Sequence, residues 1–433
     1  MLRRRPAAIT AAAVALATAM ATAGCSSSPQ MQVVAMVTAA PAGTPPADPA
    51  AQAQVVTGLD GFGLALFRKL GTGNGNLVLS PQSLTQVLTM LLPGARGTSA
   101  TALESVLGYT GLGPDQAAYA LGAQDLATEQ RAVAGSDTLT EADDVWVQKG
   151  LTLQTPYLQT LSGAFRSGVR QPDFAADPAA AANQVNQQVS QETKGLIPQL
   201  FSPTSFDADT VLVLTDATYF KAPWQQSFDP GQTAPAGFTT ATGSTAQVPM
   251  MNQTTEFGYA TGPGWKAVQL PYNGGQLAMD VLLPDSSAPG SLAAYRNSLT
   301  VPGLTAMADA FTPKQVELSL PEFTVDSDLS TLSDLLQQMG LANLFTSSAD
   351  LSGLFAPGQT NPPYVKTVVQ KAHIEVSEAG TTAAAGSGVQ VQAAAAAPTM
   401  DQVQFDANHP FVYVIRDVIS GQILFLGQVA DPS

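Results

Sequence analysis

The sequence of 433 residues is poor in the side chains that most enzymes use for catalysis. It contains one cysteine, Cys25, and two histidines, His373 and His409. A single cysteine has no partner for an intrachain disulfide, and with two histidines it cannot assemble a Cys/His metal site. The Gly-x-Ser-x-Gly, Ser-x-x-Lys and His-Glu-x-x-His signatures of common hydrolases are absent as well. The sequence therefore argues against catalysis, and we expect neither a cofactor nor a metal.

Basic residues are also scarce. The chain has 18 Lys and Arg against 33 Asp and Glu, which gives a formal net charge of −15. No basic cluster occurs after the first residues, so we expect no nucleic acid, no polyanion and no anionic lipid surface among its partners. After the start of the chain, no apolar run reaches the ~18 residues that a membrane-spanning helix needs.

The N-terminus has the pattern of an export signal. Three arginines at positions 3–5 precede an alanine-rich apolar stretch, so residues 1–24 are predicted to be a signal peptide. Ala23-Gly24-Cys25 resembles a bacterial lipobox, which predicts lipidation of Cys25. The alternative is ordinary cleavage after Ala23, which leaves Cys25 as a free thiol. We expect an exported protein of bacterial origin, either a cell-membrane lipoprotein or extracellular.

Residues 25–52 are rich in Ala, Pro, Ser and Thr and are predicted to be a flexible, lipid-anchored tether. Apolar periodic segments then follow one another without a linker, so residues 53–433 are predicted to form one large domain. Helical spacing occurs at residues 58–70 and after Ser80-Pro81. Alternating strand patterns at several later positions favour an α+β fold with mostly antiparallel sheets. Asp143 and Asp144 are predicted to lie in a solvated turn.

The most informative segment begins at Glu378 and ends in a run of five alanines at Ala397. From Thr381 to Ala393 its residues alternate strictly, with small or apolar side chains in one set and small or polar ones in the other. A strand places these two sets on opposite faces. Its Gly-Ser-Gly centre and alanine run are poor strand formers and suit an exposed loop. A segment suited both to a loop and to a buried strand indicates a conformational switch.

With these features in place, the chain resembles the serpin family over essentially all of residues 58–433. The stretches that carry the resemblance, in family order, are 76–83, 94–98, 103–107, 186–197, 214–221 with Trp224 and Phe228, 248–251, 270–272, 320–323, 378–385, 405–415 and 425–427. The resemblance implies three β-sheets, eight or nine helices and an exposed reactive loop at about residues 378–404.

The function implied by the resemblance is suicide inhibition of serine proteases by a monomeric protein. The protease forms an acyl-enzyme with the loop, and the cleaved N-terminal arm then inserts into the large sheet and traps the enzyme. An inserting hinge must be small and uncharged on its inward face. The hinge residues in this sequence are Glu378, Gly380, Thr381, Thr382, Ala383, Ala384 and Ala385. The alternative is a non-inhibitory serpin-fold protein with a binding or structural role in the cell envelope.

Counting along the family's spacing from Glu378 places the scissile bond at Ala394-Ala395. Counting backwards from Pro410 moves it to the region of Thr399-Met400. We prefer Ala394, because the alternation holds up to Ala393. Alanine suits the shallow pocket of an elastase-like or subtilisin-like protease and excludes trypsin-like ones. Cysteine proteases form a second target class, because they also pass through an acyl-enzyme.

The family also has a polar cluster, called the shutter, beneath the strands that separate. Ser80 and Ser83 match its serines, and Asp216 and Gln370 stand where an asparagine and a histidine are expected. A Gln370 amide can donate to an Asp216 carboxylate. The alternative is that these are ordinary polar core residues. Trp224 resembles the family tryptophan at the top of the opening sheet, a region called the breach, although it also fits a plain core position.

Overall fold

The computed structural model describes the chain except for residues 1–33, 44, 47, 72–74, 359–362 and 382–401. The nine α-helices in the described part are α1 (Pro49–Leu70), α2 (Pro81–Leu91), α3 (Gly97–Val106), α4 (Pro114–Ala134), α5 (Thr155–Phe165), α6 (Pro178–Glu192), α7 (Ser291–Ser298), α8 (Val301–Asp309) and α9 (Leu332–Leu336). The described residues, from 34 onwards, belong to one compact unit. No helix among the described residues is long and apolar enough to span a bilayer.

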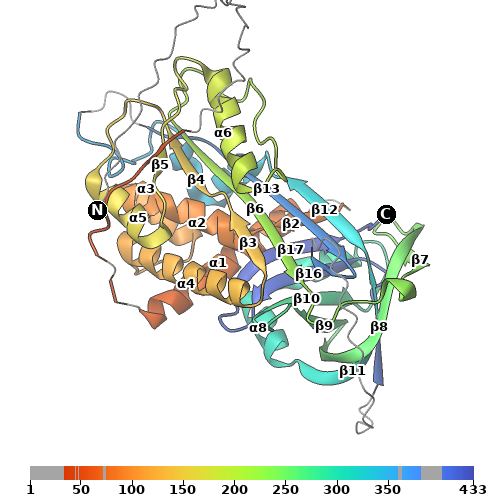
Figure 1. The fold of residues 1–433 in the computed structure, drawn as a ribbon. Coiled ribbons are helices and arrows are strands. Elements are labelled where there is room, and N and C mark those ends of the chain that lie inside the picture. Colours follow the sequence, from red (N-terminus) through yellow and green to blue (C-terminus); the bar gives the residue numbers. More distant parts are fainter. Residues whose placement is uncertain (1–33, 44, 47, 72–74, 359–362, 382–401) are drawn as a thin grey trace, which may run out of the picture. The chain divides into compact units, whose positions relative to one another are not determined.

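The strands form two hydrogen-bonded sheets (Figure 1). The first sheet has eight strands in the order β1 (Met36–Val37), β5 (Val169–Arg170), β4 (Asp144–Val147), β6 (Leu212–Pro223), β14 (Gly380–Thr381), β13 (Val365–Ser377) and β12 (Phe323–Asp328), with β3 (Thr138–Glu141) also paired to β6. The pairs β4–β5 and β6–β13 are parallel, and the other pairs are antiparallel. The sheet therefore has a parallel seam at its centre, between β6 and β13.

The second sheet has nine strands. Their order is β15 (Gln402–Asp406), β11 (Thr312–Pro321), β8 (Thr245–Gly262), β9 (Trp265–Pro271), β10 (Leu277–Pro284), β16 (Phe411–Asp417), β17 (Ile423–Val429) and β2 (Leu77–Leu79), with β7 (Ala234–Thr239) also paired to β8. The α+β class is as expected, but the hydrogen bonds join the strands into two sheets rather than three. The reason is β8, whose 18 residues pair with β7, β11 and β9 in turn.

Helices cover both faces of the first sheet (Figure 1). Alternation along β4 explains this, because successive side chains of a strand point to opposite faces. Val145 and Val147 are buried in a core with α1, α2, α4 and α5, whereas Trp146 is buried in a second core with α6. Asp48 and Ser80 begin α1 and α2 by accepting hydrogen bonds from first-turn backbone amides, with a proline at the first helical position.

The predicted tether is too long at its C-terminal end. Met36 and Val37 form β1 and pair with Val169 and Arg170 at the edge of the first sheet, and α1 already begins at Pro49. An open sheet edge offers unpaired backbone groups to any extended segment, and this proline-rich stretch supplies one. The predicted signal peptide, Cys25 and the start of the predicted tether lie outside the described residues.

Candidate functional site

The N-terminal end of the predicted hinge lies in the seam of the first sheet. Residues 212–219 of β6 pair directly with residues 365–373 of β13. Beyond that point β14 lies between the two strands, because Thr381 pairs with both Val376 of β13 and Ala222 of β6. The first two residues of a new central strand are therefore already in place. Residues 382–385 of the hinge and the Ala394-Ala395 bond lie outside the described part of the chain.

Gly380 is required by the close approach of this hinge to β6. Its φ of 147° is one that residues with a side chain rarely adopt, and a Cβ there would lie 2.2 Å from the backbone oxygen of Ala222. The preceding residues are tied to the segment after β6, since Trp224 N donates to Ala379 O and Phe228 N donates to Glu378 O. Gly380 is thus needed for a close backbone contact with β6.

Trp224 and Tyr272 hold the hinge from one side. Their rings stack with centroids 4.7 Å apart and an interplanar angle of 7°. Trp224 Nε1 donates to the backbone oxygen of Ser377, at 2.9 Å. The Tyr272 hydroxyl lies 2.7 Å from the Thr381 hydroxyl, and both residues are fully buried. Trp224 thus contacts the residue at the end of β13, next to β14, and Tyr272 contacts the hinge itself, which no sequence pattern indicated.

Two carboxyl groups meet at the base of the hinge. Glu322, between β11 and β12, and Glu378 hydrogen-bond to one another, which requires a shared proton. Burial raises the pKa of Glu322 to about 7, helped by this hydrogen bond and by the charges of Glu378 and Glu375. Burial alone would raise the pKa of Glu378, but hydrogen bonds from Thr233 and Glu322 outweigh it and hold that pKa below its usual value.

The four predicted shutter residues lie together at the part of the seam where β6 pairs directly with β13, and all four are fully buried. Gln370 lies opposite Asp216 in the parallel register, and its Nε2 donates to Asp216 Oδ2 at 2.5 Å. The same amide donates to Ser80 O at 2.9 Å and accepts from Ser80 N at 3.2 Å. Ser83 Oγ lies 2.5 Å from Asp216 Oδ1. The expected hydrogen bond between a glutamine amide and an aspartate is therefore present, and it joins β13 to β6. The bonds between Gln370 and Ser80 connect both strands with the start of α2.

Asp143 is an additional member of this cluster. It was expected in a solvated turn with Asp144, but the two residues are only 8% and 2% exposed. Asp143 Oδ1 lies 2.6 Å from Ser83 Oγ, and Gln86 donates to Asp143 Oδ2 at 3.0 Å. Asp144 is also paired inside the protein, with Arg170 Nε at 2.9 Å. The turn prediction was wrong because α2 and Arg170, both distant in sequence, cover this segment.

Burial governs the ionisation of the shutter carboxyls. It raises the pKa of Asp216 to about 7 despite hydrogen bonds from Ser83, Gln370 and Thr218 that lower it. It raises the pKa of Asp143 well above the ordinary value, and the charges of Asp216 and Glu141 act in the same direction.

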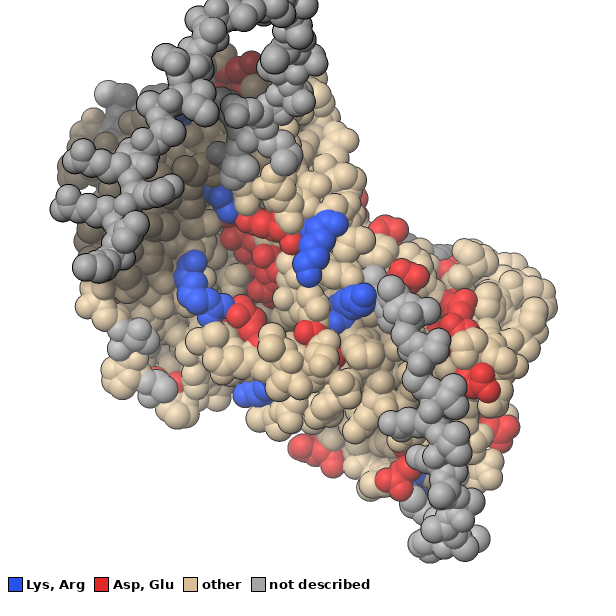
Figure 2. Space-filling view, in the orientation of Figure 1, with Lys and Arg blue, Asp and Glu red and all other residues tan. Residues whose placement is uncertain are grey.

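On the surface, Figure 2 shows Asp and Glu gathered in a hollow of the face in view, with Lys and Arg at its rim.

The two histidines have structural partners. His373 Nδ1 lies 2.7 Å from Asp326 Oδ1 on the neighbouring strand β12, and His409 Nε2 lies 2.7 Å from the backbone oxygen of Pro284. The described residues hold no cluster of three or more Asp, Glu, His or Cys that could bind a metal.

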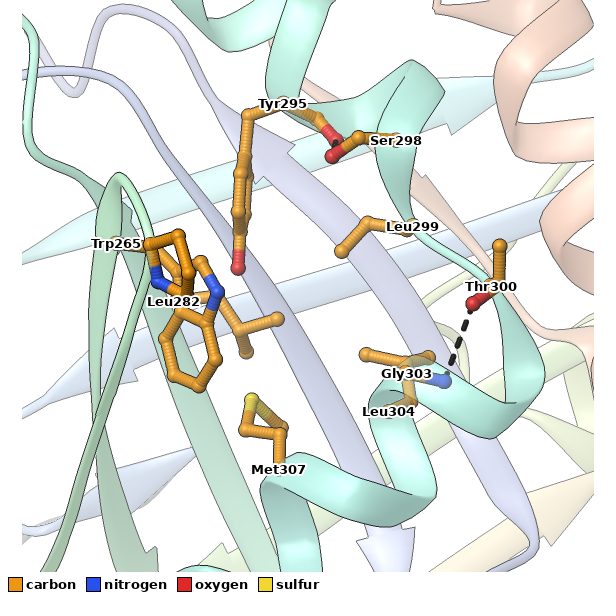
Figure 3. A pocket seen from close by; sticks show the side chains of 10 residues that line it. Trp265, Leu282, Tyr295, Ser298, Leu299, Thr300, Gly303, Leu304 and Met307 are labelled. Atoms are coloured by element: carbon orange, nitrogen blue, oxygen red, sulfur yellow. Dashed lines mark hydrogen bonds between the residues drawn. The ribbon is translucent and has the colours of Figure 1, made fainter.

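A separate cavity of about 160 Å³ lies between α7, α8 and strands β9 and β10 (Figure 3). Its lining is mostly apolar, with Trp265, Tyr295 and Met307 around the opening. The hydrogen bond from Gly303 N to Thr300 Oγ1, drawn in Figure 3, caps α8. None of its lining residues belongs to the hinge, the breach or the shutter.

Comparisons with known proteins agree with this architecture. A family model described as serpin (serine protease inhibitor) matches residues 57–432. An uncharacterized serpin-like protein of Thermococcus kodakarensis is 32% identical over 379 residues, which is 87% of this chain and 86% of that protein. The leukocyte elastase inhibitor of Bos taurus is 31% identical over 380 residues, which is 86% of this chain and 97% of that protein.

A solved structure of human thyroxine-binding globulin in complex with its ligand is similar in fold. Its TM-score is 0.77 at 23% sequence identity, and the match covers 88% of this chain and 100% of that chain. At this identity the likeness supports the fold alone.

Proposed function

This chain belongs to the serpin family, and we propose that it is a suicide-substrate inhibitor of serine proteases. The observation that carries the proposal is the position of Gly380 and Thr381 between β6 and β13. A cleaved arm that continues from Thr381 would extend a strand that has already begun. The side chains at positions 382–385 are small and uncharged, so burial of this part of the arm places no charge in the protein interior.

The proposed reaction begins at the Ala394-Ala395 bond. The serine oxygen of the protease attacks the carbonyl carbon of Ala394, the bond to the nitrogen of Ala395 breaks, and that nitrogen leaves with a proton from the protease. Insertion of the arm then separates residues 212–219 from residues 365–373, which breaks the hydrogen bond between Gln370 and Asp216. The acyl-enzyme is trapped when insertion is faster than its hydrolysis.

The proposed targets have small-residue specificity. Alanine at the recognition position suits elastase-like or subtilisin-like proteases, and cysteine proteases are a second class. The similarity to a relative named as an elastase inhibitor supports this choice. We further propose an exported monomer that acts at the cell membrane through a lipid on Cys25, or outside the cell when it is not lipidated, and that needs no nucleic acid or polyanion partner.

The test is to mix the protein with pancreatic-type elastase or with subtilisin. An inhibitor gives a covalent complex that survives detergent. The matched control is Thr381→Arg, which would place a charge at a fully buried position and should turn the protein into a substrate that is cleaved without forming a complex. In a second variant, Ala394→Arg, inhibition should shift towards trypsin. An unchanged target profile would place the scissile bond elsewhere, with the Thr399-Met400 region the next candidate.

The alternative is a serpin-fold protein with a binding or structural role in the cell envelope. The same fold occurs in human thyroxine-binding globulin in complex with a small ligand, so the fold alone does not decide between the two functions. Under this hypothesis, elastase and subtilisin would cleave the loop, no covalent complex would form, and Thr381→Arg would behave like the unchanged protein.

A further inference from the structure

The Ser83 hydroxyl lies between two buried carboxyl groups. Its Oγ is 2.6 Å from Asp143 Oδ1 and 2.5 Å from Asp216 Oδ1. A hydroxyl carries one hydrogen and can donate to only one of these oxygens. The other contact is a hydrogen bond only if that carboxyl group is protonated and donates to Ser83 Oγ. The three side chains therefore hold one proton more than two carboxylates and a serine would.

The remaining hydrogen bonds indicate where that proton lies. Asp216 accepts from Gln370 at Oδ2 and from Thr218 at Oδ1, in addition to Ser83. Among the described residues, Asp143 accepts only from Gln86 besides its contact with Ser83. Because more donors surround Asp216, it is the better-stabilised carboxylate. The proton therefore resides on Asp143 Oδ1, which donates to Ser83 Oγ, and Ser83 in turn donates to Asp216 Oδ1.

The surrounding charges favour retention of the proton. Glu141 of β3 and Asp144 of β4 both raise the pKa of Asp143, and Glu141 also interacts with Asp216. Burial raises the pKa of Glu141 and of Asp144 as well. Asp125 and Glu129 of α4 add negative charge near Glu141. The cations of this region already have partners, since Arg166 pairs with Glu129, and Arg170 pairs with Asp144 and Glu192. The residues facing the group from α2 (Gln86) and β13 (Gln370) are neutral.

We propose that Asp143, Ser83 and Asp216 form a proton-sharing lock, and that opening of the seam between β6 and β13 releases its proton. Opening moves Gln370 away from Asp216 and admits water, and a solvated pair of aspartates ionises at neutral pH. By linkage, the equilibrium ratio of the open to the closed form rises about tenfold per pH unit, over the pH range in which opening releases one proton. The closed form is thus favoured by acid. This inference deepens the proposed function and rests on it for its biological meaning, because insertion requires the same opening.

Asp143→Asn is the variant that removes the shared proton while retaining the hydrogen bonds. Its Nδ2 can donate to Ser83 Oγ, and its Oδ1 can accept from Gln86. Asp309→Asn, at the exposed end of α8, is the control for an aspartate-to-asparagine change away from these three residues. Asp216→Asn is a second variant that removes the same proton from the other side, in case Asp143→Asn does not fold.

The first measurement is amide hydrogen exchange of β6 and β13 between pH 5 and 7, after correction for the chemical exchange rate. In the unchanged protein and in Asp309→Asn, the opening constant should rise about tenfold per pH unit. In Asp143→Asn it should be nearly independent of pH. The second measurement is infrared spectroscopy of protein with labelled aspartate, in which the neutral carboxyl signal should lose one group in either asparagine variant of the lock and none in the control.

Equal pH dependence in the unchanged protein and in Asp143→Asn would overturn the inference, as would a neutral carboxyl signal that neither lock variant reduces. Neither measurement uses a protease. A failure of the proposed function, seen as cleavage without a covalent complex, is therefore distinguishable from a failure of the lock.

Discussion

Gln370 of β13 and Asp216 of β6 lie directly opposite one another in a parallel pair, with 2.5 Å between Gln370 Nε2 and Asp216 Oδ2. The same amide makes two hydrogen bonds to the backbone of Ser80, at the start of α2. One side chain thus connects the two strands of the seam with each other and with the start of the helix beneath them. The free energy that keeps the seam closed depends directly on this residue.

Gln370→Ala should therefore destabilise the protein strongly. It leaves Asp216 Oδ2 and the backbone N–H and C=O of Ser80 buried without these partners, and we expect the free energy of unfolding to fall by about 3 kcal/mol. Equilibrium urea unfolding measures this change. Gln404→Ala is the control, because Gln404 is exposed on β15 and its loss should matter by less than about 0.5 kcal/mol. Equal stability of the two variants would mean that the Gln370 contacts contribute nothing to the free energy of unfolding.

This part of the site could be predicted from the sequence because its signals are local or carried by the family resemblance. Ser80 followed by Pro81 has the pattern of a helix start, and Gln370 and Asp216 occur at positions where the family has polar residues. Their chemistry then implied a donor and an acceptor. The structure adds the distances and the register.

Asp143 could not be predicted in the same way. Two adjacent aspartates in a polar run are typical of an exposed turn, and nothing within a few residues opposes that interpretation. The partner that makes Asp143 a buried residue is Ser83, 60 positions away. Contacts of this kind depend on tertiary packing, which overrides local pattern. The position of Tyr272 against the hinge was missed for the same reason, since Thr381 lies 109 positions from it.

Tyr272→Phe should loosen the hinge without disturbing the core. The ring can still stack on Trp224, but the Thr381 hydroxyl loses its buried partner, which should cost about 1 kcal/mol. Hydrogen exchange of residues 378–381 should become faster. Tyr413→Phe is a close control, because Tyr413 is also fully buried but its hydroxyl has no hydrogen-bond partner among the described residues. It should be neutral or slightly stabilising, and a Tyr272→Phe protein with unchanged exchange would argue against the contact.

Glu322→Gln should reduce the pH dependence of stability. The pKa of Glu322 is raised to about 7 in the folded protein, from 4.5, so the folded state keeps a proton that the unfolded chain releases. Stability is therefore lost as the pH rises from about 4.5 to 7, and little more is lost above that. The lowered pKa of Glu378 acts in the opposite direction, at lower pH. A neutral amide can donate to Glu378 without a shared proton.

The size of this effect is limited because both side chains are partly solvated, and we expect less than about 1 kcal/mol. The measurement is the difference in thermal unfolding midpoint between pH 5 and pH 8. This difference should be smaller in Glu322→Gln than in the unchanged protein. Glu256→Gln, at an exposed position on β8, should leave it unaltered. If both variants shift the difference equally, net charge rather than the Glu322–Glu378 pair is responsible.

Removal of residues 34–40 should destabilise the first sheet. Met36 and Val37 pair with β5, the backbone oxygen of Val34 accepts from Arg170 Nη1 at 3.0 Å, and Val37 and Ala39 pack against the main core. These contacts are few and partly exposed, so the loss should be about 1–3 kcal/mol. It would also uncover the edge of β5 and so favour aggregation. Urea unfolding of a chain that begins at Pro41, compared with one that begins at Val34, isolates this segment from the rest of the N-terminal region. Identical midpoints for the two truncations would show that β1 contributes no stability and that the whole stretch before α1 behaves as a tether.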